Sequence, residues 1–339
     1  MVSRGRLYVA VGATIGIFVV IQLGALSLIE PFKQAGYQTV ENPSDPTNSL
    51  IYIVAIFIAT GVILAVLKFG IERLLRLLIV STSGLLSLYV FSVLVPPFIT
   101  YQGLNVTPWV MAIGVAATLY AYPEWYVIDI AGIIVGAGGA GLFGISFGPL
   151  PAILLLSVLA VYDAVSVYGT EHMLTLAEGV TDLKLPLILI IPVTLSYSFL
   201  EANPVASDGS GEDAAVENDP EPEDSAPDRT TASGDDDQGF VDRDAFVIGL
   251  GDAVMPSVMV ASAAFFSPAP AFGVPGIAIN LPALMAMVGT VVGVCMLMWM
   301  VAKGRAHAGL PLLNGGAIGG YLLGSLAAGV EVVTALGLG

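Results

Sequence analysis

Uninterrupted apolar runs of about 20 residues recur along this chain, and they constrain its fold more than any other feature. A helix of about that length is what crossing the hydrocarbon core of a bilayer requires. Only 11% of the 339 residues are charged, well below the roughly one quarter that is usual in soluble domains. The sequence therefore predicts an all-α polytopic membrane protein.

We expect nine transmembrane helices. The first is too long and too continuous with the rest of the chain for a cleaved signal peptide, so we assign it as a membrane helix. The nine segments cover about residues 7–29, 50–67, 77–98, 107–122, 126–147, 150–169, 244–266, 282–302 and 311–330.

Lysine and arginine give these helices a direction, because the cytoplasmic loops of membrane proteins are enriched in both residues. When the N-terminus is placed inside, ten of the eleven basic residues fall on the inner side and only Lys33 falls on the outer side. We therefore predict a cytoplasmic N-terminus and a C-terminus outside.

The net charge of −16 is concentrated in residues 201–243, which hold 14 of the 27 acidic residues and only two basic ones. This segment is rich in Pro, Gly and Ser, so we predict a disordered loop. It separates an N-terminal membrane part of six helices (1–200) from a C-terminal part of three (244–339). The loop is either a solvated spacer, as in an acidic and salt-adapted proteome, or a segment that binds a partner. The first explanation places the protein in the cell membrane of a salt-adapted prokaryote.

Three aspartates lie within the predicted membrane helices, where a charge costs at least a few kcal/mol. Asp163 lies about six residues, ~9 Å, from the inner end of its helix, and Asp252 lies about eight residues, ~12 Å, from the same side. Two consecutive helices thus bring carboxyl groups to similar depth. Asp129 follows the "YPEW" junction closely, so we expect a structural or interfacial residue that reaches water.

Two neighbouring carboxyl groups in a low-dielectric site cannot both ionise easily, so one keeps a proton. The ionised group can then activate water while the protonated group supports a carbonyl oxygen, as in aspartic proteases. Gly249 and Gly251 leave the backbone bare just before Asp252, which allows a peptide to approach. The alternative is a buried polar pair that only holds two helices together.

These motifs resemble those of the GxGD intramembrane aspartyl proteases, presenilin and signal peptide peptidase. Tyr162-Asp163 matches the family's YD motif, and Gly249-Leu250-Gly251-Asp252 matches its GxGD motif. The stretches "YPEWYVIDI", "YDAVSVY", "HMLTLAEGV" and "AGLPLLNGGAI" are most similar to archaeal presenilin-like homologues. The resemblance implies a presenilin-like bundle and an endopeptidase of transmembrane segments. It assigns catalysis to Asp163 and Asp252, and substrate contacts to Tyr162, Gly249, Leu250 and Gly251.

The family's third motif, PAL, has two candidates in this sequence. A literal Pro282-Ala283-Leu284 begins the eighth segment, which the predicted topology places on the outer side. Pro311-Leu312-Leu313 begins the last segment on the inner side, level with the aspartates. We assign the PAL role, which by resemblance is substrate binding, to residues 311–313, although Leu312 replaces the alanine.

The apolar stretch "LKLPLILIIP" (183–192) is too short to span a membrane. It is either a helix lying against the bundle or an extended segment that adds a strand to the substrate, as the family implies.

We expect no metal or other cofactor, because His172 and His307 stand apart from any ligand cluster and no phosphate-binding glycine loop is present. The expected partners are single-span membrane proteins or signal peptides and the lipid bilayer, without nucleic acid; the oligomeric state stays open. Two other classes of function compete with the protease: a transporter or channel that uses the same two aspartates for protons or cations, and a non-catalytic membrane scaffold. No convincing repeat supports the transporter.

Overall fold

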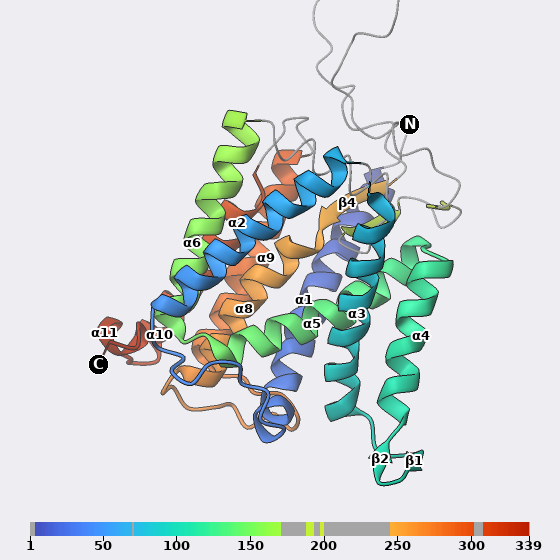
Figure 1. Ribbon diagram of the computed structural model, residues 1–339. Coiled ribbons are helices and arrows are strands. Elements are labelled where there is room, and N and C mark those ends of the chain that lie inside the picture. Colours follow the sequence, from blue (N-terminus) through green and yellow to red (C-terminus); the bar gives the residue numbers. More distant parts are fainter. Residues whose placement is uncertain are drawn as a thin grey trace, which may run out of the picture.

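The computed structural model describes residues 4–69, 71–170, 188–192, 197–199, 245–301 and 308–338. These residues form a bundle of helices with two short two-stranded sheets (Figure 1). The predicted disordered loop 201–243, residues 183–187, His172 and His307 lie outside the described residues. The helices are α1 (Arg4–Gln34), α2 (Thr47–Lys68), α3 (Glu72–Leu94), α4 (Thr107–Ala121), α5 (Trp125–Ser146), α6 (Pro149–Val165), α8 (Leu250–Phe266), α9 (Leu281–Val301), α10 (Leu310–Ala327) and α11 (Val332–Ala335). The strands are β1 (Thr100–Tyr101), β2 (Leu104–Asn105), β3 (Ile188–Pro192) and β4 (Ala245–Gly249).

Each predicted membrane segment overlaps one helix, from α1 to α6 and from α8 to α10. In the part of the chain that the structure describes, seven helices are long and apolar enough to cross a membrane. The other two, α4 with 15 residues and α8 with 17, are apolar but shorter. The polytopic helical architecture is thus confirmed, and the number of full crossings is approximate.

The predicted helix from residue 244 is wrong in its first part, because Ala245–Gly249 form strand β4. This strand pairs antiparallel with β3, so that Ile188 lies opposite Gly249 and Pro192 opposite Ala245. Residues 188–192 are therefore a strand and not a helix. A strand rises about 3.3 Å per residue, so β4 adds roughly 16 Å to the length of about 25 Å that α8 provides.

Helix α5 runs obliquely through the middle of the bundle (Figure 1). Of its apolar span, 67% is buried inside the protein, against 6% for the peripheral α2. Small residues let neighbouring helices approach α5 closely: a Cβ added at Gly24 of α1 would lie 2.8 Å from the Cβ of Ala137. The central helix is thereby fixed against α1 and provides a base for the elements that follow it.

Helices α9 and α10 pack with their backbones in contact. A Cβ added at Gly293 of α9 would lie 2.7 Å from the carbonyl oxygen of Leu312, and one added at Gly316 of α10 would overlap the carbonyl oxygen of Gly289. Such close approach is possible only where side chains are missing. The position of α10 therefore depends on α9.

Candidate active site

Asp163 lies near the end of α6, with only 7% of its surface exposed. Its Oδ2 accepts a hydrogen bond of 3.0 Å from the backbone N–H of Leu310, the first residue of α10. The first N–H groups of a helix have no partner within the helix, so a carboxylate there satisfies one of them. Asp163 thus joins the end of α6 to the start of α10.

Asp252 is the third residue of α8 and is partly buried. Strand β4 delivers it to this position, since Gly249 ends the strand and is also the residue that precedes the helix. Leu250 anchors the junction, because its side chain fills the space over the central helix where Gly132 and Gly136 have none. The packing of Leu250 against α5 consequently fixes the start of α8, where Asp252 lies.

Both carboxyl groups meet at the turn that starts α10. A Cβ added at Gly309 would lie 3.5 Å from Oδ2 of Asp252, while the next residue, Leu310, donates to Asp163. A Cβ added at Gly249 would lie 3.3 Å from the same Asp252 oxygen. The two acids are near enough to interact electrostatically. The structure therefore brings together the predicted aspartates and the turn that contains Pro311.

The two PAL candidates lie at opposite ends of α10. Pro311 directly follows Leu310, the donor to Asp163. Pro282 instead packs against Gly324, whose added Cβ would lie 2.8 Å from the Cα of Pro282. Gly324 is about 21 Å from Leu310 along the helix. The structure therefore places Pro311, and not Pro282, at the turn beside the two aspartates.

The residues with predicted substrate contacts differ in how accessible they are. Leu250 and Leu313 are buried, 6% and 0% exposed, and belong to one apolar cluster. Pro311 and Leu312 are partly exposed, and Gly251 is exposed. Leu250 and Leu313 therefore support the site from the protein core, whereas Gly251, Pro311 and Leu312 are accessible to a substrate.

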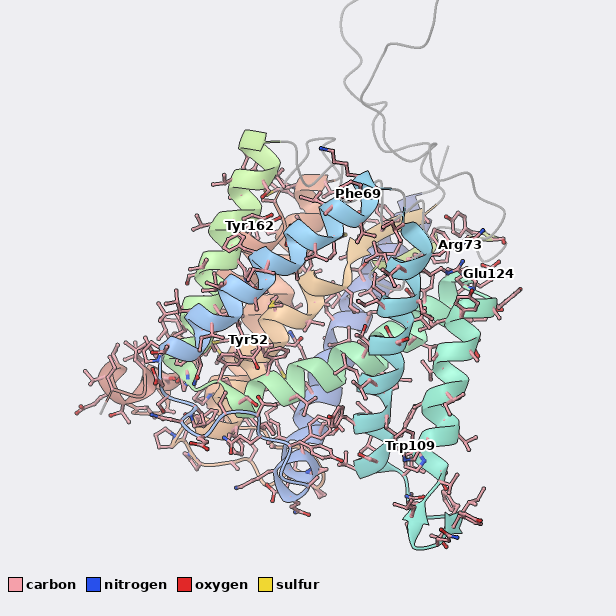
Figure 2. All side chains as sticks on the ribbon, in the orientation of Figure 1. Tyr52, Phe69, Arg73, Trp109, Glu124 and Tyr162 are labelled. Atoms are coloured by element: carbon pink, nitrogen blue, oxygen red, sulfur yellow. The ribbon has the colours of Figure 1, made fainter. Side chains whose placement is uncertain are left out.

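Tyr162 lies on α6 near the end of the bundle that also carries Arg73 and Glu124, whereas Trp109 lies towards the opposite end (Figure 2). Its ring packs edge-on against Phe57 of α2, with 5.1 Å between the ring centroids. Tyr162 is therefore in contact with the peripheral helix α2.

Three further features of the site were not predicted from the sequence. The N–H of Ala308 donates to the hydroxyl of Tyr168 over 3.3 Å, and the buried Asn314 donates from Nδ2 to the carbonyl oxygen of Leu156 over 3.0 Å. Asn314 is recognisable as a polar residue in an apolar helix. Pro256 is recognisable too: it lies four residues after Asp252 in α8 and cannot donate to that residue's carbonyl group.

The expectation that Asp129 reaches water is wrong. Asp129 is buried, with 7% exposure, and its Oδ1 accepts a hydrogen bond of 2.8 Å from the N–H of Ile190 in β3. The strand that covers it is distant in sequence, so the neighbourhood of the "YPEW" junction gave no sign of this burial. Asp129 therefore binds strand β3 and does not lie at the membrane interface.

Among the residues that the structure describes, no group of three or more His, Cys, Asp or Glu could hold a metal ion. At the turn that starts α10 the structure brings together the carboxyl groups of Asp163 and Asp252 with the backbone of Gly309 and Leu310. Two such groups can exchange a proton with a water molecule and with a peptide carbonyl oxygen, which is acid–base hydrolysis.

Comparisons with known proteins agree with this chemistry. A profile of the family described as "Signal-peptide peptidase, presenilin aspartyl protease" matches residues 15–330. Two solved structures of a presenilin family intramembrane aspartate protease, in space groups C222 and P2, match with TM-scores of 0.61 and 0.60. Their sequences are 33% and 32% identical, and the matches cover 94% and 93% of this chain and 99% and 97% of theirs. No curated protein matches the chain.

The matches extend over nearly the whole chain, including both aspartates, and they favour a protease over a transporter. The protein is an integral, multi-pass membrane peptidase. The chain belongs to the signal-peptide peptidase and presenilin family of intramembrane aspartyl proteases.

Proposed function

We propose that Asp163 and Asp252 are the catalytic pair of this protease. The observation that carries the proposal is their common position at the start of α10, where Asp163 binds the N–H of Leu310 and Asp252 lies against Gly309. Two neighbouring carboxyl groups in a low-dielectric site cannot both ionise easily, so in this proposal the pair shares one proton.

The pair hydrolyses a peptide bond in two steps. The ionised carboxyl group takes a proton from water while the water oxygen attacks the peptide carbonyl carbon, and the protonated carboxyl group gives its proton to the carbonyl oxygen. The resulting gem-diol then collapses: its hydroxyl proton returns to a carboxylate, a proton passes to the amide nitrogen, and the carbon–nitrogen bond breaks. The pair ends with one proton, as it began.

The substrate strand joins the sheet at β4. Residues 183–192 were expected to pair with the substrate, but one edge of β3 is already paired with β4. In this proposal the substrate therefore pairs with β4 instead. Val247 of β4 is 43% exposed, and the alternation of an antiparallel ladder turns its N–H and C=O away from β3. An extended peptide paired there would lie next to Gly249 and Gly251, where no side chain blocks its approach to Asp252.

Pro311 and Leu312 contact the unwound substrate on its other side, and Leu250 and Leu313 hold these contacts in place from the core. Tyr162, against Phe57, marks the side on which the substrate passes between α6 and α2. The substrates are single-span membrane proteins or signal peptides, since only a peptide within the bilayer can reach a site among membrane helices.

The protein lies in the cell membrane of a salt-adapted prokaryote, and its N-terminus is on the cytoplasmic side. The distribution of basic residues supports this orientation. Arg73, one of the basic residues that this orientation places inside, lies towards the end of the bundle opposite Trp109 (Figure 2). The chain works as two membrane parts, residues 1–200 with Asp163 and residues 244–339 with Asp252, joined by the acidic segment 201–243.

Purified protein in detergent, incubated with a membrane-spanning reporter peptide, tests the proposal. Mass spectrometry should find new termini inside the apolar segment. Asp163→Asn and Asp252→Asn should each abolish them while thermal unfolding stays as in the wild type, because each removes one half of the acid–base pair. Glu30→Gln, an exposed carboxyl group on α1, is the control and should cleave normally. Cleavage by either aspartate variant at the wild-type rate would refute the assignment.

A further inference from the structure

Asp129 is a further buried acid of the bundle, and it takes no part in the proposed chemistry. Its carboxyl group binds the N–H of Ile190 in the middle of β3 over 2.8 Å. It lies on α5, while the catalytic candidates lie on α6 and α8. A buried carboxyl group in a membrane helix is costly, so its position calls for a function of its own.

The hydrogen bond closes one edge of the sheet. Ile190 lies opposite Val247 in the β3–β4 ladder. Because Ile190 donates to Asp129, its N–H points away from β4, towards the outer edge of β3. An open edge presents backbone groups to which another strand can add. Asp129 occupies this edge, so a peptide can add to the sheet only beside β4.

Both faces of β3 are buried as well. Ile188 and Ile190 belong to the apolar cluster that contains Ile128 of α5, and Leu189 belongs to the cluster that contains Leu250. The strand therefore contacts protein on both faces and at both edges. Its position along α5 is fixed by side-chain packing together with the hydrogen bond that Ile190 donates to Asp129 of the central helix.

A second acid holds the chain just beyond β3. Glu124, at the start of α5 (Figure 2), accepts hydrogen bonds from the hydroxyl of Ser198 over 2.6 Å and from the N–H of Phe199 over 3.0 Å. Asp129 within α5 and Glu124 directly before it thus bind β3 and the residues that follow it. Asp129 is the one that acts on the strand itself.

The position of β3 is transmitted to the site. Leu189 of β3 and Leu250 of the GLGD motif both pack against Gly132, where an added Cβ would lie 3.0 Å from the first and 3.6 Å from the second. Strand β4 pairs with β3 and leads within three residues to Asp252. A shift of β3 along α5 would therefore move the pairing strand relative to the dyad of Asp163 and Asp252.

We propose that Asp129 is a positioning residue: by accepting the N–H of Ile190 it fixes the β3–β4 sheet on α5 and so determines which substrate bond faces the dyad. The proposal rests on the proposed protease function. It requires a hydrogen-bond acceptor at residue 129 and does not require a negative charge. Asn keeps the acceptor oxygen, whereas Leu has similar volume without it.

The test compares Asp129→Asn and Asp129→Leu in the reporter assay, with Ile130→Leu, on the exposed side of α5, as the control. Full-length variants in detergent are assayed for kcat/KM, for thermal unfolding and for the positions of the new termini. Asp129→Leu should lower kcat/KM by roughly 10-fold, in line with the loss of a buried hydrogen bond, and should spread cleavage over neighbouring bonds. Asp129→Asn and Ile130→Leu should cleave at the wild-type positions with kcat/KM within about threefold of wild type.

A loss of stability alone would lower the amount of active protein without moving the cleavage positions. The proposal would therefore be overturned if Asp129→Leu cleaved the reporter at the wild-type positions, whatever its rate. It would also be overturned if Asp129→Asn spread cleavage over neighbouring bonds as much as Asp129→Leu does. If Asp129→Leu does not fold, Asp129→Ser, which is too short to reach Ile190, takes its place under the same criteria. Absence of cleavage by the wild type would instead refute the proposed function, and Asp163→Asn run in parallel separates that outcome from failure of the positioning role.

Discussion

Gly293→Ala should disturb the active site from behind, through the contact between α9 and α10. The new Cβ would lie 2.7 Å from the carbonyl oxygen of Leu312, whereas ordinary contacts begin at 3.4 Å. The two helices must therefore separate by about 0.7 Å or tilt. If this displacement reaches Leu310 in full, its 3.0 Å hydrogen bond to Asp163 lengthens to about 3.7 Å, beyond hydrogen-bond range.

The cost of such overpacking is typically about 1–3 kcal/mol of stability. Displacement of a catalytic turn by about 1 Å can lower the rate by about 100-fold, so we expect a loss of about 10- to 100-fold in kcat/KM at the smaller shift. Thermal unfolding in detergent measures the first effect, and reporter cleavage measures the second.

Gly315→Ala is the matched control on α10, because an added Cβ there meets no atom within 4 Å. In a helix this change stabilises by up to about 1 kcal/mol, so the control should be as stable as wild type or more so, and fully active. A Gly293→Ala protein with wild-type stability and cleavage would refute the reasoning, because it would show that the close contact with α9 does not position α10.

Two further predictions concern the arrangement of the chain. After replacement of Cys295, the single cysteine, a cysteine pair at Leu313 and Leu250 should crosslink, since both side chains belong to one buried cluster. A cysteine pair at Leu284 and Leu250 should not crosslink. Crosslinking of that second pair alone would reverse the assignment of the PAL role. Deletion of Asp208–Asp237 should leave reporter cleavage by the purified protein within a few-fold of wild type, because the composition of this segment suits a spacer; a folded but inactive deletion variant would show that the segment is needed for substrate entry.

The sequence was sufficient for the features that depend on hydrophobicity and depth. Apolar runs located the helices, and the distances of Asp163 and Asp252 from the same side of the membrane predicted that they would meet. The same argument separated Pro311 from the literal Pro282-Ala283-Leu284 motif, which the structure places against Gly324, far from Leu310.

Features that depend on tertiary contacts were not predictable. The apolar residues Ala245–Gly249 continue into α8 without a break, and a short apolar run does not distinguish a buried strand from a helix. Residues 245–249 form a strand because they pair with β3. The N–H of Leu310 is a backbone group and has no sequence signal at all. Asp129 was expected to reach water because it follows the "YPEW" junction closely. Its partner Ile190 is 61 positions away in the chain, so the sequence around Asp129 gave no sign of this contact.

The β1–β2 hairpin gives experimental access to the sidedness of the molecule. It projects beyond α3 and α4, away from the end that carries Glu124 (Figures 1 and 2). Gln102 and Gly103 form its two-residue turn with φ of 50° and 84°, and Tyr101 and Leu104 beside them are exposed. Such tips tolerate inserted sequence, because no buried contact depends on them. An epitope tag between Gln102 and Gly103 should therefore leave the bundle unaltered. Antibody binding on intact cells would place the hairpin outside, and binding only on permeabilised cells would place it inside.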